Sequence, residues 1–183
     1  IDPPAQFFSM GHSSRVRMSH FNFSASWVNG SCPHPVQEAG HANSGLCEPQ
    51  NSDGVDIAAG THDVHIHDAF IQNGDDTITI KYGYDSPATR TGCVRDVLVE
   101  DMVYRFGWGS NVGGPPFGGC AENITFRRIA MSDMAGAGCV VKTENTTDPS
   151  SYVRDVLWED ITINGSRDNQ KGCVGVSSLY QQS

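Results

Sequence analysis

A seven-residue pattern recurs along the chain and constrains its fold more than any other feature. The pattern opens with Asp, Asn or Arg and continues with apolar residues that alternate with other side chains. Its copies begin at Arg15, Asp63, Asp96, Asn123 and Asp155. Alternation with a period of two is typical of a β-strand with one buried face. The chain is therefore predicted to be an array of strand-containing repeats.

The spacing of the copies indicates how the repeats stack. Their first apolar residues lie 48, 33, 27 and 32 residues apart, and we interpret the interval of 48 as two repeats of about 24 residues. A second set of short apolar runs lies between the copies, at residues 55–58, 77–81, 110–113, 139–143 and 173–177. Each repeat thus holds at least two strands, with Gly, Asn and Asp at the turns between them.

Units of about 22–24 residues without helical periodicity are typical of a solenoid in which each coil of the chain stacks on the next. We predict an all-β fold, a partial right-handed parallel β-helix. An antiparallel sandwich is the alternative. It needs tight hairpin turns, and only the Asn-Gly pairs at 29–30, 73–74 and 164–165 would supply them.

Length and charge narrow the domain organisation and the classes of partner. We expect the 183 residues, 1–183, to form a single domain. The chain opens Ile-Asp-Pro-Pro, without an initiator Met or a signal peptide, so we expect an interior segment of a longer polypeptide. The net charge of −9 disfavours nucleic acid and anionic membranes as partners, and no apolar run approaches the roughly 18 residues of a membrane helix. We expect a monomer.

The cysteines and the glycosylation sequons favour a secreted protein. Five Asn-x-Ser/Thr sequons, where about one or two would occur by chance, begin at Asn22, Asn29, Asn123, Asn145 and Asn164. Cys93 and Cys120 each lie three residues before a strand of neighbouring coils, so stacking would bring them within disulfide reach. Two further pairs stay open: Cys139 and Cys173 as a bond or as stacked thiols, and Cys32 and Cys47 as a bridge across a loop.

Three aspartates are the candidate reactive groups. Asp53 lies 23 residues before Asp76, one coil along the chain, and Asp75 precedes Asp76 directly. Stacking would place the carboxylates side by side, and crowded like charges raise the pKa of at least one of them. A protonated acid beside ionised carboxylates is what glycosidic cleavage requires. Asp-Gly and Gly-Asp-Asp are also ordinary turn sequences, which is the alternative interpretation.

These motifs resemble those of the polygalacturonase family, glycoside hydrolase family 28. Its members are pectin-cleaving parallel β-helices with successive motifs Asn-Thr-Asp-Gly, Gly-Asp-Asp, Gly-His-Gly and Arg-Ile-Lys. The run Asn51-Ser-Asp-Gly matches the first motif with one conservative change, and Gly74-Asp-Asp matches the second. The resemblance covers about residues 51–180, which would be the catalytic coils.

The resemblance implies a role for each matched residue. Asp75 would be the general acid, and Asp53 and Asp76 the bases that orient and deprotonate a water, without a cofactor or a metal. The implied mechanism is a single displacement with inversion, for which carboxyl groups usually lie about 6.5–9.5 Å apart. Asn51 would hold the first carboxylate, and Lys142 and Tyr180 would line the sugar cleft.

Two departures from the family motifs concern the substrate. Trp108 stands in place of the histidine of Gly-His-Gly, and Val140 in place of the arginine of Arg-Ile-Lys. That arginine and its lysine grip a uronic acid carboxylate in the family, and valine cannot make such a charge-assisted contact. Trp108 offers a flat face for a sugar ring, unless it packs under a loop. The more distantly similar family 49, the dextranases and isopullulanases, uses a comparable aspartate set on neutral glucans.

We therefore predict an inverting O-glycoside hydrolase that acts on a pectic polysaccharide or a more neutral or modified glycan. The alternatives are a carbohydrate-binding β-helix that has lost catalysis and a Ca²⁺-dependent polysaccharide lyase. His62, His65 and His67 have a spacing that metals can use, but we expect His65 and His67 to lie in solvent, away from the aspartates. Lys81 is expected either to neutralise part of the aspartate cluster or to cap the strand surface.

Overall fold

The chain forms two parallel sheets that stack coil upon coil. The computed structural model describes residues 7–24, 52–82, 92–113, 119–134, 136–142, 151–166 and 174–177, and these residues contain strands but no helix. The short sheet has the order β1-β4-β6-β8-β10-β12, with bounds Phe8–Met10, Val55–Ala58, Ile78–Lys81, Ser110–Gly113, Cys139–Lys142 and Val174–Ser177. The long sheet has the order β2-β5-β7-β9-β11, with bounds Ser14–Ser19, His62–Asn73, Val94–Phe106, Cys120–Met134 and Tyr152–Ser166; β3, Asn22–Ser24, also pairs with β5.

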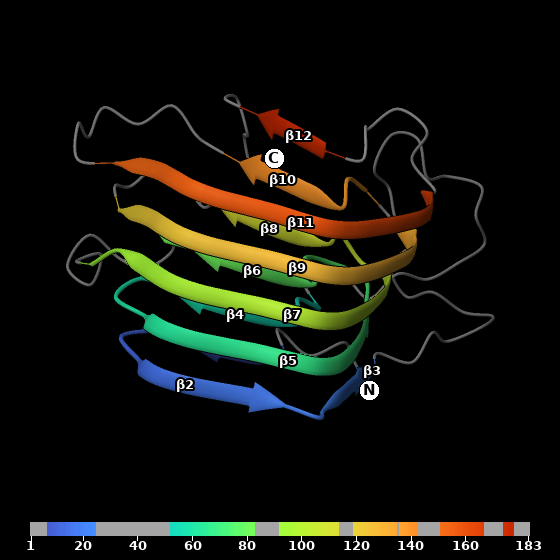
Figure 1. The fold of residues 1–183 in the computed structure, drawn as a ribbon, viewed down its shortest axis with the longest axis horizontal. Helices are drawn as coiled ribbons and strands as arrows, with labels where there is room; N and C mark the ends of the chain where they lie inside the picture. The colour runs from blue at the N-terminus through green and yellow to red at the C-terminus, as the bar shows by residue number, and fades with distance from the viewer. Residues whose placement is uncertain are drawn as a thin grey trace, which may run out of the picture.

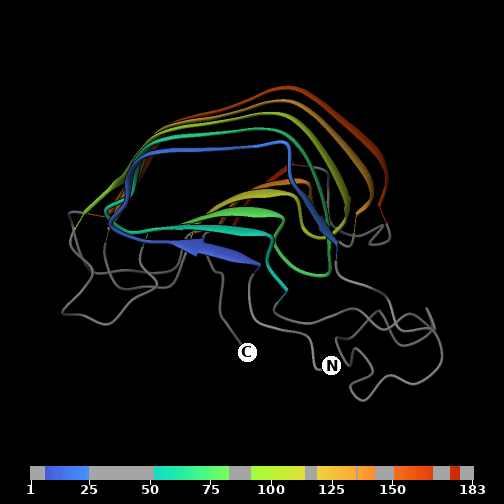
Figure 2. The ribbon, with the colours of Figure 1, turned by 90° about the horizontal axis from the view of Figure 1, so that it is seen from below.

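The predicted right-handed parallel β-helix is confirmed. In Figure 1 the strands of the long sheet run from left to right in front, those of the short sheet run from right to left behind, and the chain climbs from β2 to β12. This sense of coiling is right-handed. Figure 2 shows the long sheet as a broad arch over the flatter short sheet.

The sequence repeats correspond to rows of stacked residues. Val16 pairs with Val64, Val64 with Val97, Val97 with Ile124, and Ile124 with Val156. The interpretation of the 48-residue interval as two coils was wrong, because Val16 and Val64 are direct neighbours. The extra length lies instead in the sequence between β3 and β4.

The aspartates of the repeat pattern turn the corners of the arch. Most positive-φ residues of the long sheet fall into two rows, one being Arg15, Asp63, Asp96, Asn123 and Asp155, the other His20, Asp68, Asp101, Arg128 and Asp160; Phe106 and Asp133 add two more near the ends of β7 and β9. For an L-residue this left-handed conformation costs about 1–2 kcal/mol, and Asp and Asn tolerate it because their short side chains can hydrogen-bond locally. Each long strand therefore bends where a row crosses it, which explains why β5, β7, β9 and β11 are longer than the pattern predicted.

One hydrophobic core fills the space between the sheets. In the short sheet Ile57, Ile80 and Val112 pair in a row, and none of the three is exposed. Burial of each such side chain contributes about 1.5–3 kcal/mol. Because side chains alternate along a strand, the residues between them, among them Asp56 and Lys81, face away from this core.

The expected bridge between neighbouring coils is confirmed by a disulfide between Cys93 and Cys120. Cys139 is buried at the start of β10, and its proposed partner Cys173 lies outside the described residues, as do Cys32 and Cys47. Within the described residues no helical segment has the length and hydropathy that a membrane span requires.

Candidate active site

The three predicted aspartates meet at the start of β4 and β6. Val55 pairs with Ile78, and the backbone N–H of Gly54 donates to the carbonyl of Asp76 over 2.9 Å. This register sets Asp53 directly beside Asp76. One carboxylate oxygen of Asp53, one of Asp75 and one of Asp76 all lie within 4.8 Å of one another. The predicted stacking of these residues is confirmed.

Asn73, which the sequence analysis did not single out, organises the turn that carries the acid pair. Its side chain is fully buried, and its amide Nδ2 donates to the carbonyls of Ser52, Asp75 and Asp76 at 2.8–2.9 Å. Its Oδ1 accepts a hydrogen bond from the Thr77 hydroxyl at 3.1 Å. One buried amide thus ties the turn before β6 to the segment before β4, and it fixes the separation of the carboxylates.

The Gly-Trp-Gly segment before β8 braces the same turn. The backbone N–H groups of Gly107 and Trp108 donate to the carbonyls of Asn73 and Asp75 at 2.9 and 2.8 Å. Gly107 has a φ of +37°, and a Cβ there would lie 2.4 Å from Asn73 Oδ1, so only glycine permits this approach. Gly136 packs in the same way under the Trp108 ring, 2.3 Å from Cε3 to an ideal Cβ.

Two lysines neutralise the outer members of the cluster. Lys142 on β10 bridges both carboxylate oxygens of Asp76 at 2.8 and 3.0 Å. Lys81 on β6 donates to Asp53 and, at 3.1 Å, to Asp56. Of the two expectations for Lys81, neutralisation is therefore the one observed. Both ammonium groups oppose the binding of a metal cation by the three carboxylates.

Two further polar residues of this face were missed in the sequence. Asp56 lies one strand position before the core residue Ile57 and is only 2% exposed. Asn111, in register with Val140, donates through Nδ2 to Asp76 and, at 3.0 Å, to the carbonyl of Trp108. The sequence signal for both residues was the alternation of side chains along β4 and β8, because it places them on the face of the strand that points away from the core.

Burial and the crowding of like charges raise the pKa of Asp75 and Asp56, the carboxyl groups that the lysines neutralise least. Burial is the main cause that raises the pKa of Asp75 to about 6, and the charges of Asp53 and Asp76 act in the same direction. Burial also raises the pKa of Asp56 to about 7, against the attraction of Lys81. The site thus holds two carboxyl groups with raised pKa values, Asp75 and Asp56, beside Asp53 and Asp76, which each lie closest to a lysine ammonium.

The three aspartates bring single carboxylate oxygens close to one another. One oxygen of each residue lies within 4.8 Å of the corresponding oxygens of the other two. Two oxygens at this separation can both accept hydrogen bonds of about 2.8 Å from one water. The arrangement can therefore hold a water between two of these carboxylates.

The predicted sugar-binding residues are only partly within the described chain. Trp108 is half-buried, with Lys142 Nζ 6.0 Å from its ring centroid, and Val140 shares the outward face of β10 with Lys142. Lys142 itself is bound to Asp76. Asn51 and Tyr180 lie outside the described residues.

The histidines lie on the other sheet, as expected, but not all of them lie in solvent. His65 Nε2 is 2.7 Å from Glu100, and His67 lies between Asp68 at 2.6 Å and the Arg17 guanidinium at 3.0 Å. His67 is only 7% exposed, so its expected exposure was wrong. The cause is the packing of the His65 and His20 rings and of Arg17 around it.

Sequence comparisons identify relatives of this chain in two Aspergillus species. A probable rhamnogalacturonase C of Aspergillus flavus is 28% identical over 121 residues, which are 66% of this chain and 23% of that protein. A probable endo-xylogalacturonan hydrolase A of Aspergillus fumigatus is 29% identical over 140 residues, 74% of this chain and 32% of that protein. The chain thus spans 23% and 32% of the length of these two relatives. No solved structure matches it.

The family comparison covers almost the whole chain. The model of the glycosyl hydrolases family 28 matches residues 1–177, which include all the described strands. The resemblance of the aspartate motifs is thereby confirmed, and the chain belongs to glycosyl hydrolases family 28.

Proposed function

We propose that these coils carry the catalytic carboxylates of a glycoside hydrolase that cleaves a pectic polysaccharide by single displacement. The observation that supports this most directly is the division of the cluster into a proton-holding acid, Asp75, and two ion-paired carboxylates, Asp53 and Asp76. A pair of titratable groups whose environments differ in this way is the usual mark of an acid and its base. As part of the proposal, the enzyme is secreted and monomeric.

In the proposed reaction Asp75 donates its proton to the glycosidic oxygen as the bond from that oxygen to the anomeric carbon breaks. A water held over Asp53 and Asp76 attacks the same carbon and loses a proton to one of these carboxylates. The products are a new reducing end and a free hydroxyl. Proton exchange with solvent then restores the acid and the base.

The substrate preference that we propose depends on β10 and the segment before β8. Val140 presents an apolar surface where the family motif has an arginine, and Lys142 is bound to Asp76. A uronic acid at this position would lack the charge-assisted bidentate contact that arginine provides. Trp108 adds an aromatic surface beside it. We infer that this subsite takes a sugar without a free carboxylate, within a pectic chain such as rhamnogalacturonan or xylogalacturonan.

A product analysis of the full-length protein tests the proposal. The protein would be incubated with polygalacturonate, rhamnogalacturonan, xylogalacturonan and a neutral glucan, and products would be measured as reducing ends and by mass spectrometry. We expect saturated oligosaccharides from a branched or mixed pectin in excess of those from polygalacturonate. Unsaturated products that absorb ultraviolet light would instead indicate a lyase, and binding without new reducing ends a carbohydrate-binding protein.

The stereochemistry of the first product is a second test, because a single displacement by water inverts the configuration of the anomeric carbon. Proton NMR of the anomeric region during the first minutes of hydrolysis reports the configuration before mutarotation. We expect the configuration opposite to that of the cleaved bond. A product of retained configuration would mean that one aspartate attacks the sugar directly, and it would overturn the assigned roles of Asp53 and Asp76.

A further inference from the structure

Lys81 and Asp56 lie beneath the catalytic aspartates and have no role in the reaction described above. Lys81 is the last residue of β6, pairs in register with Ala58 and is 9% exposed. Its ammonium reaches Asp53 on one side and Asp56 Oδ2 on the other, at 3.1 Å. The other oxygen of Asp56 is buried and has no hydrogen-bond partner among the described residues. A buried lysine is thus held between one residue of the trio and a second, more deeply buried carboxyl group.

The charges on this face do not balance when every group is ionised. The titratable groups that face Lys81 and its partners are Asp53 and Asp56 beside β4, Asp75 and Asp76 before β6, and Lys142 on β10. Counted over the described residues alone, four carboxylates and two ammonium groups leave an excess of two negative charges, which is costly in a buried site. Two bound protons restore neutrality.

The geometry indicates where these protons are held. Lys142 neutralises Asp76, and Lys81 lies closest to Asp53. Asp56 has an unsatisfied buried oxygen, which disfavours its ionised form. The raised pKa values of Asp75 and Asp56 agree with this assignment, while burial of Lys81 is outweighed by the attraction of Asp53 and Asp56, which raises the pKa of its ammonium.

We propose that Lys81, held by Asp56, is a positioning residue that keeps Asp53 ionised as a base and so leaves the catalytic proton on Asp75. The inference rests on the proposed function for its effect on catalysis. Lys81 itself does not touch the reacting atoms; it acts through Asp53. Without its charge, Asp53 and Asp75 compete for one proton, and the distinction between base and acid is lost.

The test compares the pH dependence of kcat/KM in the full-length protein and three variants. Lys81→Met removes the charge, Lys81→Arg keeps it, and Asp56→Asn replaces a neutral carboxyl by a neutral amide. An opposite charge at this distance lowers the pKa of a carboxyl by about 1–3 units. We therefore expect the acidic limb of the Lys81→Met profile to move up by about 1–3 pH units, with a smaller upward shift of the basic limb.

The two control variants separate this role from simple structural support. Lys81→Arg should return the acidic limb toward that of the wild type. Asp56→Asn should leave the acidic limb within about half a pH unit of the wild type, because the amide mimics the protonated acid that the structure favours below pH 7. A structural role would lower all profiles without moving their limbs. Coincident limbs in wild type and Lys81→Met would overturn the proposal.

A measurement independent of activity distinguishes failure of this inference from failure of the proposed function. If the wild type cleaves none of the polysaccharides, the proposed function fails, but the titration of Asp53 can still be followed by carboxyl carbon-13 NMR after labelling of aspartate. We expect that titration to move to higher pH in Lys81→Met and to stay in place in Asp56→Asn. An unchanged Asp53 titration in Lys81→Met would end the proposal. If Lys81→Met does not fold, the NMR signal of the Asp53 carboxyl is compared in wild type, Lys81→Arg and Asp56→Asn. The proposal expects Asp53 to stay ionised in all three, and loss of its charge in Lys81→Arg would contradict the proposal.

Discussion

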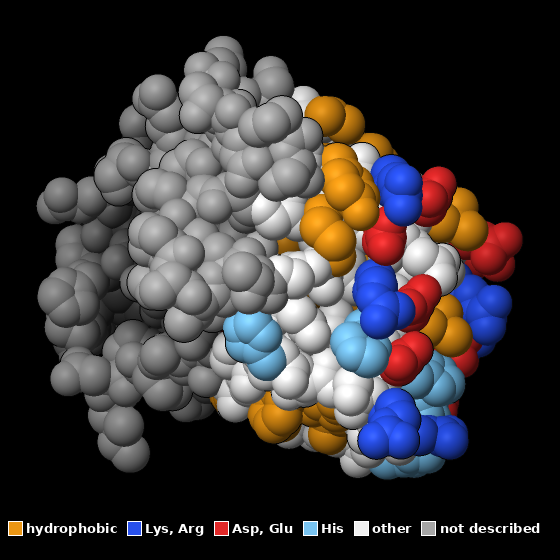
Figure 3. Space-filling model, turned by 90° about the vertical axis from the view of Figure 1, so that its left-hand side faces the viewer, with side chains coloured by type: hydrophobic (Ala, Val, Ile, Leu, Met, Phe, Trp, Pro, Cys, Tyr) orange, Lys and Arg blue, Asp and Glu red, His pale blue; other side chains and the backbone are white. Residues whose placement is uncertain are grey.

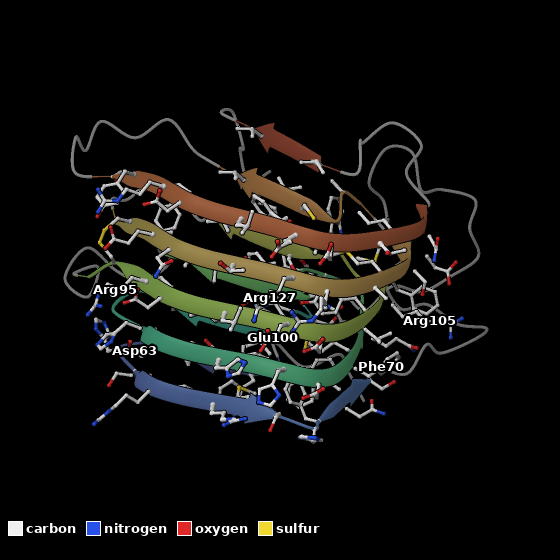
Figure 4. The ribbon with its side chains drawn as sticks, in the orientation of Figure 1. Asp63, Phe70, Arg95, Glu100, Arg105 and Arg127 are labelled. Carbon is white, nitrogen blue, oxygen red and sulfur yellow. A yellow bond between two sulfur atoms is a disulfide. The ribbon has the colours of Figure 1, made fainter. Side chains whose placement is uncertain are left out.

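The outward faces of the two sheets both carry ladders of acidic and basic side chains, but they balance charge in opposite ways. On the long sheet Glu100 of β7 is bound by Arg127, Arg128 and His65, each at 2.7 Å. Figure 4 shows Glu100 and Arg127 side by side on adjacent strands. Figure 3 shows basic and acidic side chains next to each other over the described surface at one end of the strands. On the short sheet four aspartates share two lysines.

The two arrangements shift carboxyl pKa values in opposite directions. Burial acts to raise the pKa of Glu100, but the hydrogen bonds from Arg127, His65 and Arg128 outweigh it and lower that pKa to about 2. Burial and like charges raise the pKa of Asp75 to about 6. Stacked charges thus lower a carboxyl pKa where several cations surround one carboxylate, and they raise it where carboxylates outnumber cations. The ratio of cations to carboxylates, more than residue type, separates the two faces.

The largest effect is expected from removing the acid. Asp75→Asn should reduce kcat about 1,000-fold, because a positioned general acid contributes roughly 10²–10⁴-fold. The melting temperature should stay equal or rise, since one crowded carboxylate is gone. The matched control is Asp101→Asn on the long sheet, where Asn tolerates the φ of +54° and kcat should not change. A kcat above a tenth of the wild-type value in Asp75→Asn would show that Asp75 is not the general acid.

A smaller effect is expected at the proposed sugar subsite. Val140→Arg restores the arginine of the family motif next to Lys142, and a charge-assisted hydrogen bond contributes about 1.5–3 kcal/mol. The ratio of kcat/KM for polygalacturonate to that for a neutral-sugar-containing pectin should rise about 10- to 100-fold. Val140→Leu serves as the control of equal polarity and should leave the ratio unchanged. An unchanged ratio in Val140→Arg would mean that β10 does not set the preference.

The two faces should also respond oppositely to pH in their contribution to stability. The pKa of Glu100 is depressed, so its contribution is present above about pH 4.5 and is lost as the pH falls toward 2. The pKa values of Asp75 and Asp56 are raised, so the folded site favours their protonated forms and loses about 2–3 kcal/mol per group as the pH rises from 4 to 7. Denaturant unfolding between pH 2 and 8 measures both. Asp75→Asn should flatten the loss between pH 4 and 7, and a slope identical to that of the wild type would contradict the raised pKa.

The sequence predicted some contacts between coils correctly and others wrongly. The 23-residue interval between Asp53 and Asp76 predicted their contact correctly, because one coil separates neighbours in a stacked sheet. The 48-residue interval between Val16 and Val64 was misread, because a long connection and an extra coil have the same length in sequence. Only the pairing register of β2 with β5 distinguishes a long connection from an extra coil.

The electrostatic roles were harder to predict. Asp56 was read as part of a strand, and its meeting with Lys81 requires both the alternation along β4 and β6 and the reach of a lysine side chain. Asp96 was recognised as the first residue of a repeat copy, but neither it nor Asp101 was predicted to be left-handed. In both cases the sequence contained the period, whereas the surroundings of each carboxyl arise only when the coils stack.

The smallest effect is expected from the charge ladder of the long sheet. Glu100→Gln keeps the shape of the side chain but removes the charge that Arg127 and Arg128 share, so the free energy of unfolding at pH 7 should fall by about 1–2 kcal/mol. Glu159→Gln, on the exposed neighbouring position of β11, should change it by less than about 0.5 kcal/mol. Both variants should keep the wild-type kcat. A loss of activity in Glu100→Gln at full folding would show that the two faces are coupled through the core, and the separation of a structural from a catalytic face would not hold.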